Sequence, residues 1–355
     1  MLKHFVITRL GLAVYGERRL NDIIDLFEMV TLPSLLRQSS QDFIPLIIVD
    51  ADMPEAARGR IEQLLSPYPS FNLVAIDLTG LTQVRQGCFD WIWDRCQDVV
   101  LEAGLIEDPA QYIITSVIDA DDAWHRDVVQ TVNAFMAERL PRACDGDKDR
   151  GTWLQHTCGI AATFARGYKW FIAADAWEAF EHPFMSMAVF VAARFSSGIS
   201  ACSSRHLAWP AYCNVLAFEA AAIEQAEPMW LWVRHNRTTQ PWDASALASV
   251  DGPTSIARCG TFGIDLDKLQ RWRGRFAAAK AASPSFAHAG RSASDQYDRI
   301  FKIAGLNRQI AALWRRRRTL TATPAEVRSL DAAIAQKEAQ RTALVDVLRA
   351  QGIDD

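Results

Sequence analysis

Two aspartates separated by one residue mark the most chemically distinctive point of the chain. Asp119 and Asp121 follow the apolar run 112–118 (YIITSVI), which is typical of a buried β-strand. Carboxylates spaced in this way can present oxygens to one hard divalent cation, and Mg²⁺ or Mn²⁺ held so keeps open positions for phosphate oxygens. The same DADD pattern is also an ordinary helix start, where acidic side chains cap backbone N–H groups. The residue types alone leave both interpretations open.

The elements that position these aspartates can be predicted from hydrophobic patterning. Strand-like runs alternate with helical segments: strands at 5–8, 46–49, 72–77 and 112–118, and helices at 21–38, 54–65 and 84–103. This alternation predicts an α/β fold with a doubly wound, mainly parallel sheet. Ligands of such sheets bind beyond the carboxyl ends of the strands, where Asp50, Asp77 and Asp119 lie.

The pattern changes in the second half of the chain. Residues 152–165, 168–173, 184–193 and 228–235 read as strands, some of them antiparallel, and 208–226 reads as a helix. We therefore expect one mixed-sheet domain over 1–245, with two halves at 1–125 and 150–245. A linker at 246–293 follows.

The last segment, 294–355, is predicted to be an α-helical hairpin. Its second helix begins with a Thr-Pro-Ala-Glu start at 323–326. From residue 291 onward there are 12 basic and 8 acidic residues, although the whole chain has a net charge of −4. The four arginines at 315–318 are either a solvated face or a contact for anionic lipid or acidic glycan. The hairpin is thus a candidate for homo-oligomer assembly or peripheral membrane contact.

Composition excludes several classes of protein. Of the 355 residues, 50% are hydrophobic and 23% charged, which is typical of a globular protein. The negative net charge does not favour nucleic acid as a partner. The seven cysteines form no CxxC pair, so neither a zinc site nor a disulfide framework is predicted, and reduced thiols are expected. No apolar run reaches about 18 residues and no signal peptide is evident, so we expect a cytoplasmic protein.

Several motifs resemble those of known enzymes. LPSLLRQ at 32–38, DF at 42–43 and LIIVD at 46–50 resemble the opening of family 2 nucleotide-sugar glycosyltransferases of the GT-A fold, whose DxD motif falls where Asp119 and Asp121 lie. More narrowly, the chain over 1–245 resembles the bacterial rhamnosyltransferase family. The motifs that carry this resemblance are Thr8-Arg9, TLPSLLRQSSQDF (31–43), IDADDAW (118–124) and WLWVRHN (230–236).

The resemblance implies a GT-A-like (Rossmann-like) hexosyltransferase that depends on Mn²⁺ or Mg²⁺. Its half at 1–125 would bind the nucleotide sugar, and its half at 150–245 would bind the acceptor. Such an enzyme would move a sugar, rhamnose by the family's name, from a nucleotide diphosphate to a saccharide or lipid-linked acceptor in surface polysaccharide synthesis. A divalent cation would neutralise the leaving diphosphate. Transfer of sugar to a lipid-linked acceptor would place the protein peripherally at the inner face of the membrane.

The resemblance also implies roles for single residues. Asp121 would be the main metal ligand, with Asp119 nearer the ribose or the metal. His235 would be a further ligand, unless it is only a polar residue at a strand end. The remaining donor contacts would be Arg9, Arg234 and Arg237 to phosphate, Asp50 to base or ribose, and Asp77 to base. Surface ion pairs and loop caps are the alternative roles for Arg9, Asp50 and Asp77.

The general base of an inverting transfer is not resolved. Asp175, Glu181 and His206 are candidates, and a retaining transfer would need none of them. Two rival functions remain: a nucleotidyltransferase acting on sugar phosphates, and a non-catalytic sugar-binding or scaffold protein. The first would normally need a glycine-rich phosphate loop, which Gly11 and Gly16 do not form.

Overall fold

The main sheet has seven strands, and all four of the strands predicted in the first half of the chain belong to it. The computed structural model describes residues 2–12, 17–76, 90–145, 158–172, 175–203, 209–216, 218–235, 252–282 and 324–350. In spatial order the strands are β10 (Glu219–Ala222), β6 (Ile160–Thr163), β9 (Val189–Arg194), β4 (Tyr112–Asp119), β1 (Lys3–Arg9), β2 (Ile44–Asp50) and β3 (Asn72–Ile76).

Strand directions make this a mixed sheet. The first four strands run parallel, with β1 between β2 and β4 and β3 outside β2. β9 is antiparallel to both β4 and β6. The central strands are buried on both faces, as expected for strands covered by helices on both sides. The predicted mixed α/β sheet is confirmed.

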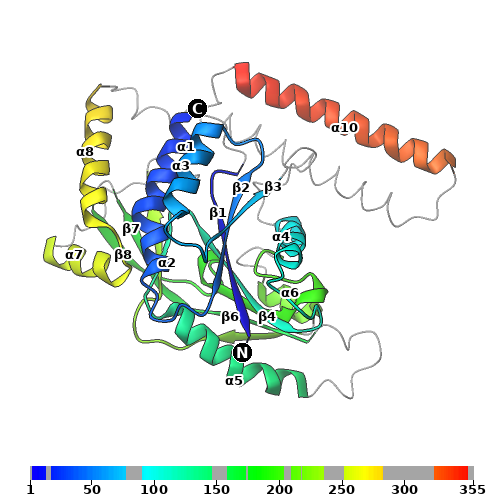
Figure 1. Cartoon of the computed structure of the whole chain (residues 1–355), viewed down its shortest axis with the longest axis horizontal. Helices are drawn as coiled ribbons and strands as arrows, with labels where there is room; N and C mark the ends of the chain where they lie inside the picture. Colours follow the sequence, from blue (N-terminus) through cyan, green and yellow to red (C-terminus); the bar gives the residue numbers. More distant parts are fainter. Residues whose placement is uncertain are drawn as a thin grey trace.

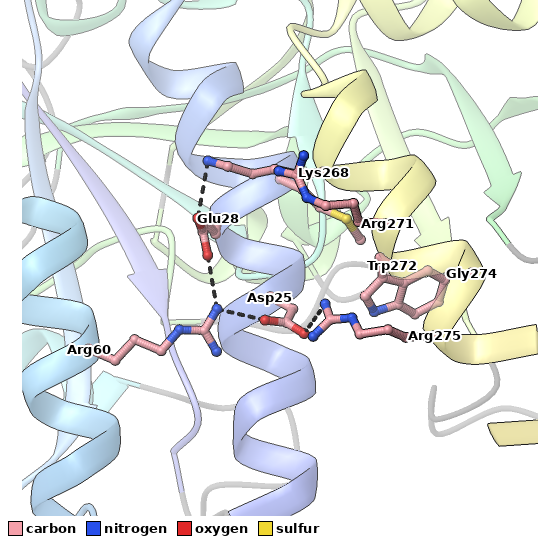
Figure 2. Close-up of a pocket in the computed structure, with 9 residues that line it drawn as sticks. Asp25, Glu28, Arg60, Lys268, Arg271, Trp272, Gly274 and Arg275 are labelled. Carbon is pink, nitrogen blue, oxygen red and sulfur yellow. Dashed lines mark hydrogen bonds and ion pairs between the residues drawn. The ribbon is translucent and has the colours of Figure 1, made fainter. Parts of the chain in front are cut away.

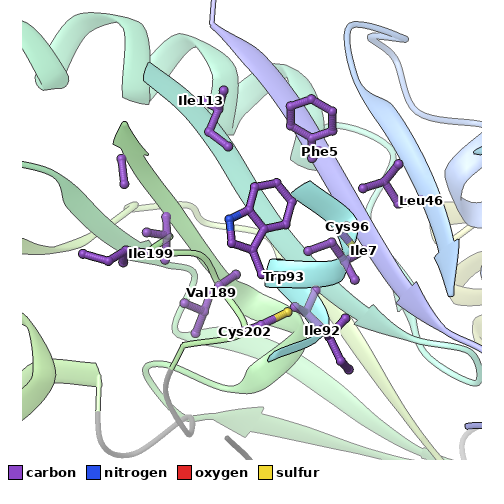
Figure 3. Packing of buried hydrophobic residues seen from close by; sticks show 14 of the residues in the cluster. Phe5, Ile7, Leu46, Ile92, Trp93, Cys96, Ile113, Val189, Ile199 and Cys202 are labelled. Carbon is purple, nitrogen blue, oxygen red and sulfur yellow. The ribbon is translucent and has the colours of Figure 1, made fainter. Parts of the chain in front are cut away.

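Helices cover both faces of the sheet (Figure 1). One face carries α1 (Glu17–Leu26), the π-helical turn Phe27–Thr31, α2 (Leu32–Leu36), α3 (Glu55–Leu65) and α5 (Val128–Asp145). The other face carries α4 (Asp90–Glu102) and α6 (Trp209–Leu216). On α4, the indole of Trp93 is fully buried and lies 5.9 Å from the ring of Phe5 on β1 (Figure 3). The doubly wound arrangement therefore follows from strands whose successive side chains point to opposite faces and are apolar on both of them.

A second sheet stands beside the carboxyl end of β4. Its order is β5 (Ala123–Trp124), β11 (Trp230–Arg234), β7 (Arg166–Phe171) and β8 (Ala176–Glu181). Gly167 on β7 allows the Trp230 indole to lie directly against the backbone, because a Cβ there would fall 2.0 Å from the ring. β11 pairs antiparallel with β5, which begins directly after the DADD turn. This pairing brings the end of β11 next to the acidic turn.

Two predicted features of the second half differ in the structure. The helix expected over 208–226 ends at Leu216, because residues 219–222 form β10 and pair with β6. The segment 246–293, expected to be a linker, contains α7 (Gly252–Thr261) and α8 (Leu266–Ala282). Both helices bury side chains against the second sheet, including Cys259 and Trp272.

Two of the seven cysteines are bonded to each other. Cys144 and Cys158 form a disulfide with their Cα atoms 5.6 Å apart, so the expectation that all thiols are reduced is wrong for these two residues.

α10 (Pro324–Ala350) is the second helix of the predicted hairpin, and the first, 294–318, lies outside the described residues. None of the helices in the described ranges combines the length and apolar character that crossing a membrane requires.

Candidate functional site

The main sheet changes its direction of growth between β1 and β4. From β1 the chain adds β2 and β3 on one side and then returns to add β4 on the other. Ligands of open α/β sheets bind at such a switch point, beyond the carboxyl ends of the strands. Arg9 and Asp119 end these two strands and are direct register partners, and Arg9 Nη2 donates a hydrogen bond to Asp119 Oδ1. Two of the predicted site residues therefore meet at the switch point.

Asp50 ends β2 on the same face of the sheet. Side chains alternate along a strand, so Arg9, Asp50 and Asp119 share the face that packs against α4. Asp50 is 1% exposed, and its Oδ1 accepts a hydrogen bond of 3.0 Å from the backbone N–H of Asp52. Its Oδ2 has no hydrogen-bond partner within the described part of the chain. A buried acceptor left unpaired costs about 1–3 kcal/mol, so a ligand donor at this position would be stabilising.

Asp121 and His235 form the second contact of the site. Asp121 lies in the turn after β4, and His235 directly follows β11. The antiparallel pairing of β5 with β11 brings these residues together, although they are 114 positions apart in the sequence. His235 Nε2 lies 2.9 Å from Asp121 Oδ2. The two residues predicted as ligands from distant parts of the sequence are thus in direct contact.

Asp122 fixes the position of this pair. It is 2% exposed, and its Oδ1 accepts a 3.0 Å hydrogen bond from the backbone N–H of Val233, two residues before His235. Thr31 Oγ1 donates to the Asp122 carbonyl at 2.8 Å. Burial, with the charges of Asp121 and Asp119, raises the pKa of Asp122 well above its ordinary range. Asp122 therefore joins β11 to the acidic turn, which makes it a positioning residue.

Asp121 and His235 have the chemistry of metal ligands, and in this structure they are joined by a hydrogen bond of 2.9 Å. Two ligands at about 2.1 Å from a cation and at a right angle to each other lie about 3.0 Å apart, close to the observed 2.9 Å. Asp119 instead contacts Arg9. Within the described ranges no three His, Cys, Asp or Glu residues are grouped as a metal site. The residues present therefore fit a cation held by one carboxylate and one imidazole, with the remaining positions left to other ligands.

Arg234 adds a second positive charge beside the acidic turn. Its side chain is largely buried, and its guanidinium lies 4.5 Å from the centre of the Trp232 ring. Burial lowers the pKa of Arg234, and the charges of Asp122 and Asp121 oppose that shift. Arg9 and Arg234 thus place positive charge next to Asp119 and next to the Asp121–Asp122 pair, respectively.

Asp175, a candidate base, makes contacts that hold neighbouring elements of the fold together. Its Oδ1 accepts hydrogen bonds from four donors: Trp170 Nε1 (3.0 Å), Trp177 Nε1 (3.4 Å), Ser255 Oγ (2.8 Å) and Arg273 Nη2 (2.7 Å). Burial alone would raise the pKa of Asp175, but these donors, Arg273 foremost, lower it. The carboxylate therefore joins the β7–β8 hairpin to α7 and α8, and a base role for it stays a prediction.

Four predicted residues remain: Glu181, Asp77, His206 and Arg237. Glu181 ends β8, is 68% exposed in its side chain and lies 3.9 Å from Arg166, so its role as a base also stays a prediction. Asp77, His206 and Arg237 lie outside the described residues. Thr31, which holds the acidic turn through its hydroxyl, was not predicted, because a threonine within a helical pattern carries no sequence signal for such a contact.

The fold and the site define an α/β protein with acidic residues at its topological switch point, which is where open α/β sheets bind ligands. The chain belongs to the family described as "Putative rhamnosyl transferase", whose model matches residues 7–241. It is therefore a member of a glycosyltransferase family. A search of curated proteins found no match.

Solved structures give weak similarities. S. aureus TarS aligns at 9% identity with a TM-score of 0.32, covering 66% of this chain and 37% of TarS. TarS 1–349 in complex with UDP aligns at 9% identity with a TM-score of 0.32, covering 99% of this chain and 92% of TarS 1–349. The apo form of mouse xyloside xylosyltransferase 1 aligns at 13% identity with a TM-score of 0.29, covering 61% of this chain and 72% of the transferase. The family match, and not these alignments, identifies the chain.

Proposed function

We propose that this protein is a metal-dependent GT-A glycosyltransferase that transfers a sugar from a nucleotide diphosphate donor to a saccharide or lipid-linked acceptor. The observation that carries the proposal is the contact of Asp121 with His235 beside the Arg9–Asp119 pair at the switch point. The family description favours rhamnose as the sugar. Surface polysaccharide synthesis at the inner face of the cytoplasmic membrane would supply such an acceptor.

The donor would lie along the carboxyl ends of β4, β1 and β2. Asp50, with its unpaired buried oxygen, would accept a hydrogen bond from the base or ribose. Arg9 and Arg234 would bind diphosphate oxygens, because a guanidinium matches the geometry of phosphate. For Arg9 this requires its bond to Asp119 to be shared with, or replaced by, a bond to the donor.

Asp121 and His235 would hold Mn²⁺ or Mg²⁺. A bound divalent cation would act as a Lewis acid that neutralises charge on the diphosphate as the glycosidic bond breaks. Asp122 and Thr31 keep the turn and β11 in register, so that the imidazole and carboxylate already face each other before a ligand binds. This preorganisation reduces the cost of assembling the site.

A panel of nucleotide sugars tests the proposal. The purified protein should hydrolyse or transfer at least one of them in the presence of Mn²⁺ and lose this activity in EDTA. Asp121→Asn should abolish the activity and leave the fold intact, because the amide keeps the shape but removes the charge. Full activity of Asp121→Asn with unchanged dependence on Mn²⁺ would contradict the metal site.

The same panel distinguishes the rival functions. Release of pyrophosphate from a nucleoside triphosphate and a sugar phosphate would instead identify a nucleotidyltransferase. The absence of any turnover, together with sugar binding, would favour a scaffold protein.

A further inference from the structure

A separate charged pocket lies between three helices outside the proposed donor site. It has a volume of about 530 Å³ and is lined by residues of α1, the π-helical turn, α3 and α8. The lining charged side chains are four basic and two acidic: Arg60, Lys268, Arg271, Arg275, Asp25 and Glu28. None of the donor-site residues described above lines it. A volume of this size is typical of a small-molecule site.

The two acidic residues are already neutralised by three of the four cations (Figure 2). Arg60 lies 2.6 Å from Asp25 and 2.9 Å from Glu28. Lys268 and Arg275 extend from α8 to the other oxygens of Glu28 (3.1 Å) and Asp25 (2.7 Å). Each carboxylate oxygen therefore faces a cation. Lys268 also lies 3.5 Å from Asp265 Oδ2, so the four basic residues exceed their acidic partners by one positive charge.

Arg271 supplies charge that no acidic residue in the described ranges balances. It lies between Lys268 and Arg275 in the sequence of α8, and spacings of three and four residues put all three on one helix face. Arg271 is exposed, and it makes no ion pair or hydrogen bond with any residue in the described ranges. Its guanidinium is thus available to a ligand without breaking an existing contact.

We propose that this pocket binds a small phosphate-bearing anion through Arg271 together with Arg60, Lys268 and Arg275. Guanidinium groups pair with phosphate through two parallel hydrogen bonds, and three of the four cations are arginines. The excess positive charge attracts an anion. The pocket is larger than a phosphate group needs, which leaves room for an organic part such as a sugar.

The position of the pocket links its ligand to the donor site. Glu28 lies three residues before Thr31 in the same π-helical turn, and Thr31 bonds to the carbonyls of Asp122 and Asp119. Met29 in the same turn accepts a backbone hydrogen bond of 2.9 Å from Asp265, next to α8. A phosphate that draws α8 and α3 toward the pocket would therefore act on the helix that holds the acidic turn.

Isothermal titration of the full chain with glucose 1-phosphate and with inorganic phosphate, in EDTA, tests the proposal. Arg271→Gln should weaken binding at least about tenfold, because it removes a charge-assisted hydrogen bond and breaks no ion pair. Arg271→Lys should bind with intermediate affinity. Arg142→Gln on α5 is the control outside the pocket and should bind like the wild type, since Arg142 is 74% exposed and its ion pair with Glu138 (3.4 Å) is also on the surface.

The outcomes separate the possible sources of the ligand. Tighter binding of glucose 1-phosphate indicates a phosphorylated metabolite, and equal affinities indicate free phosphate; both support the site. Binding that Arg9→Gln abolishes and Arg271→Gln leaves unchanged would place the anion in the donor site and overturn the proposal. Absence of binding in the wild type, or equal weakening by Arg142→Gln, would also overturn it. No nucleotide sugar or turnover enters these measurements, so they do not depend on the proposed function.

Discussion

The hydrogen bond from Val233 N–H to Asp122 gives a sharp test of how the site is positioned. Replacing Asp122 by alanine removes the acceptor and leaves a buried backbone N–H unpaired. Asparagine keeps an oxygen in the same place but removes the acidic group. The difference between the two variants therefore isolates the hydrogen bond from the effect of the charge.

The expected size of this difference follows from the burial of the group. An unpaired buried N–H costs about 1–3 kcal/mol, so Asp122→Ala should unfold with a free energy lower than that of Asp122→Asn by this amount. Because the pKa of Asp122 is raised in the folded state, the wild type loses stability as pH rises above the ordinary aspartate value. Asp122→Asn should lack this loss and be at least as stable as the wild type at neutral pH.

The functional effect should appear in metal affinity. Losing a residue that orients a metal ligand typically costs about 10–100-fold in metal affinity, so Asp122→Ala should raise the Mn²⁺ concentration for half-maximal activity by such a factor. Urea unfolding and Mn²⁺ titrations of donor hydrolysis measure the two effects. If Asp122→Asn were as impaired as Asp122→Ala, the carboxylate itself and not the hydrogen bond would be required, and the positioning role would be refuted.

Three further predictions follow from the sequence and the structure. His235→Ala should weaken Mn²⁺ affinity more than acceptor affinity, and equal losses of activity at limiting and saturating Mn²⁺ would show that His235 is not a ligand. Burial lowers the pKa of His4 from 6.5 to about 4 in the folded state. As pH falls, His4 therefore takes up a proton in the unfolded chain before it does so in the folded protein, which favours unfolding. The free energy of unfolding should therefore drop by about 3 kcal/mol between about pH 6.5 and 4; urea unfolding at several pH values should show this drop in the wild type, and the same drop in His4→Gln would contradict the assignment. Deleting the residues after about 292 should leave donor hydrolysis largely unchanged and alter oligomeric state or liposome binding, and light scattering with liposome sedimentation would reject a docking role if neither changed.

The candidate site was predicted in part because strand ends are visible in the sequence. Apolar runs followed by a charged residue predicted where β1, β2 and β4 end, and hence where Arg9, Asp50 and Asp119 lie. The sequence contained no signal for the bond between Arg9 and Asp119, because it depends on which strand lies next to β1. That order is set by the packing of helices on both faces of the sheet.

Some residues have roles that a local pattern could not indicate. Asp122 reads as a helix cap but binds the backbone of β11. Asp175 reads as a possible base but accepts four hydrogen bonds from residues on four separate elements, β7, β8, α7 and α8. The alanine-rich residues 219–222 favour a helix but pair with β6, because tertiary context overrides a weak local propensity.

The sequence by itself determined the α/β class, the strand ends that carry acidic residues, and the family, because these depend on local periodicity and on short motifs. Only the tertiary structure decided that Asp121 meets His235, that Arg9 meets Asp119, and that Cys144 pairs with Cys158. Two of these contacts join residues more than 100 positions apart, and the disulfide joins residues separated by 14 positions. Their geometry depends on sheet order and register, which arise from the packing of the whole core.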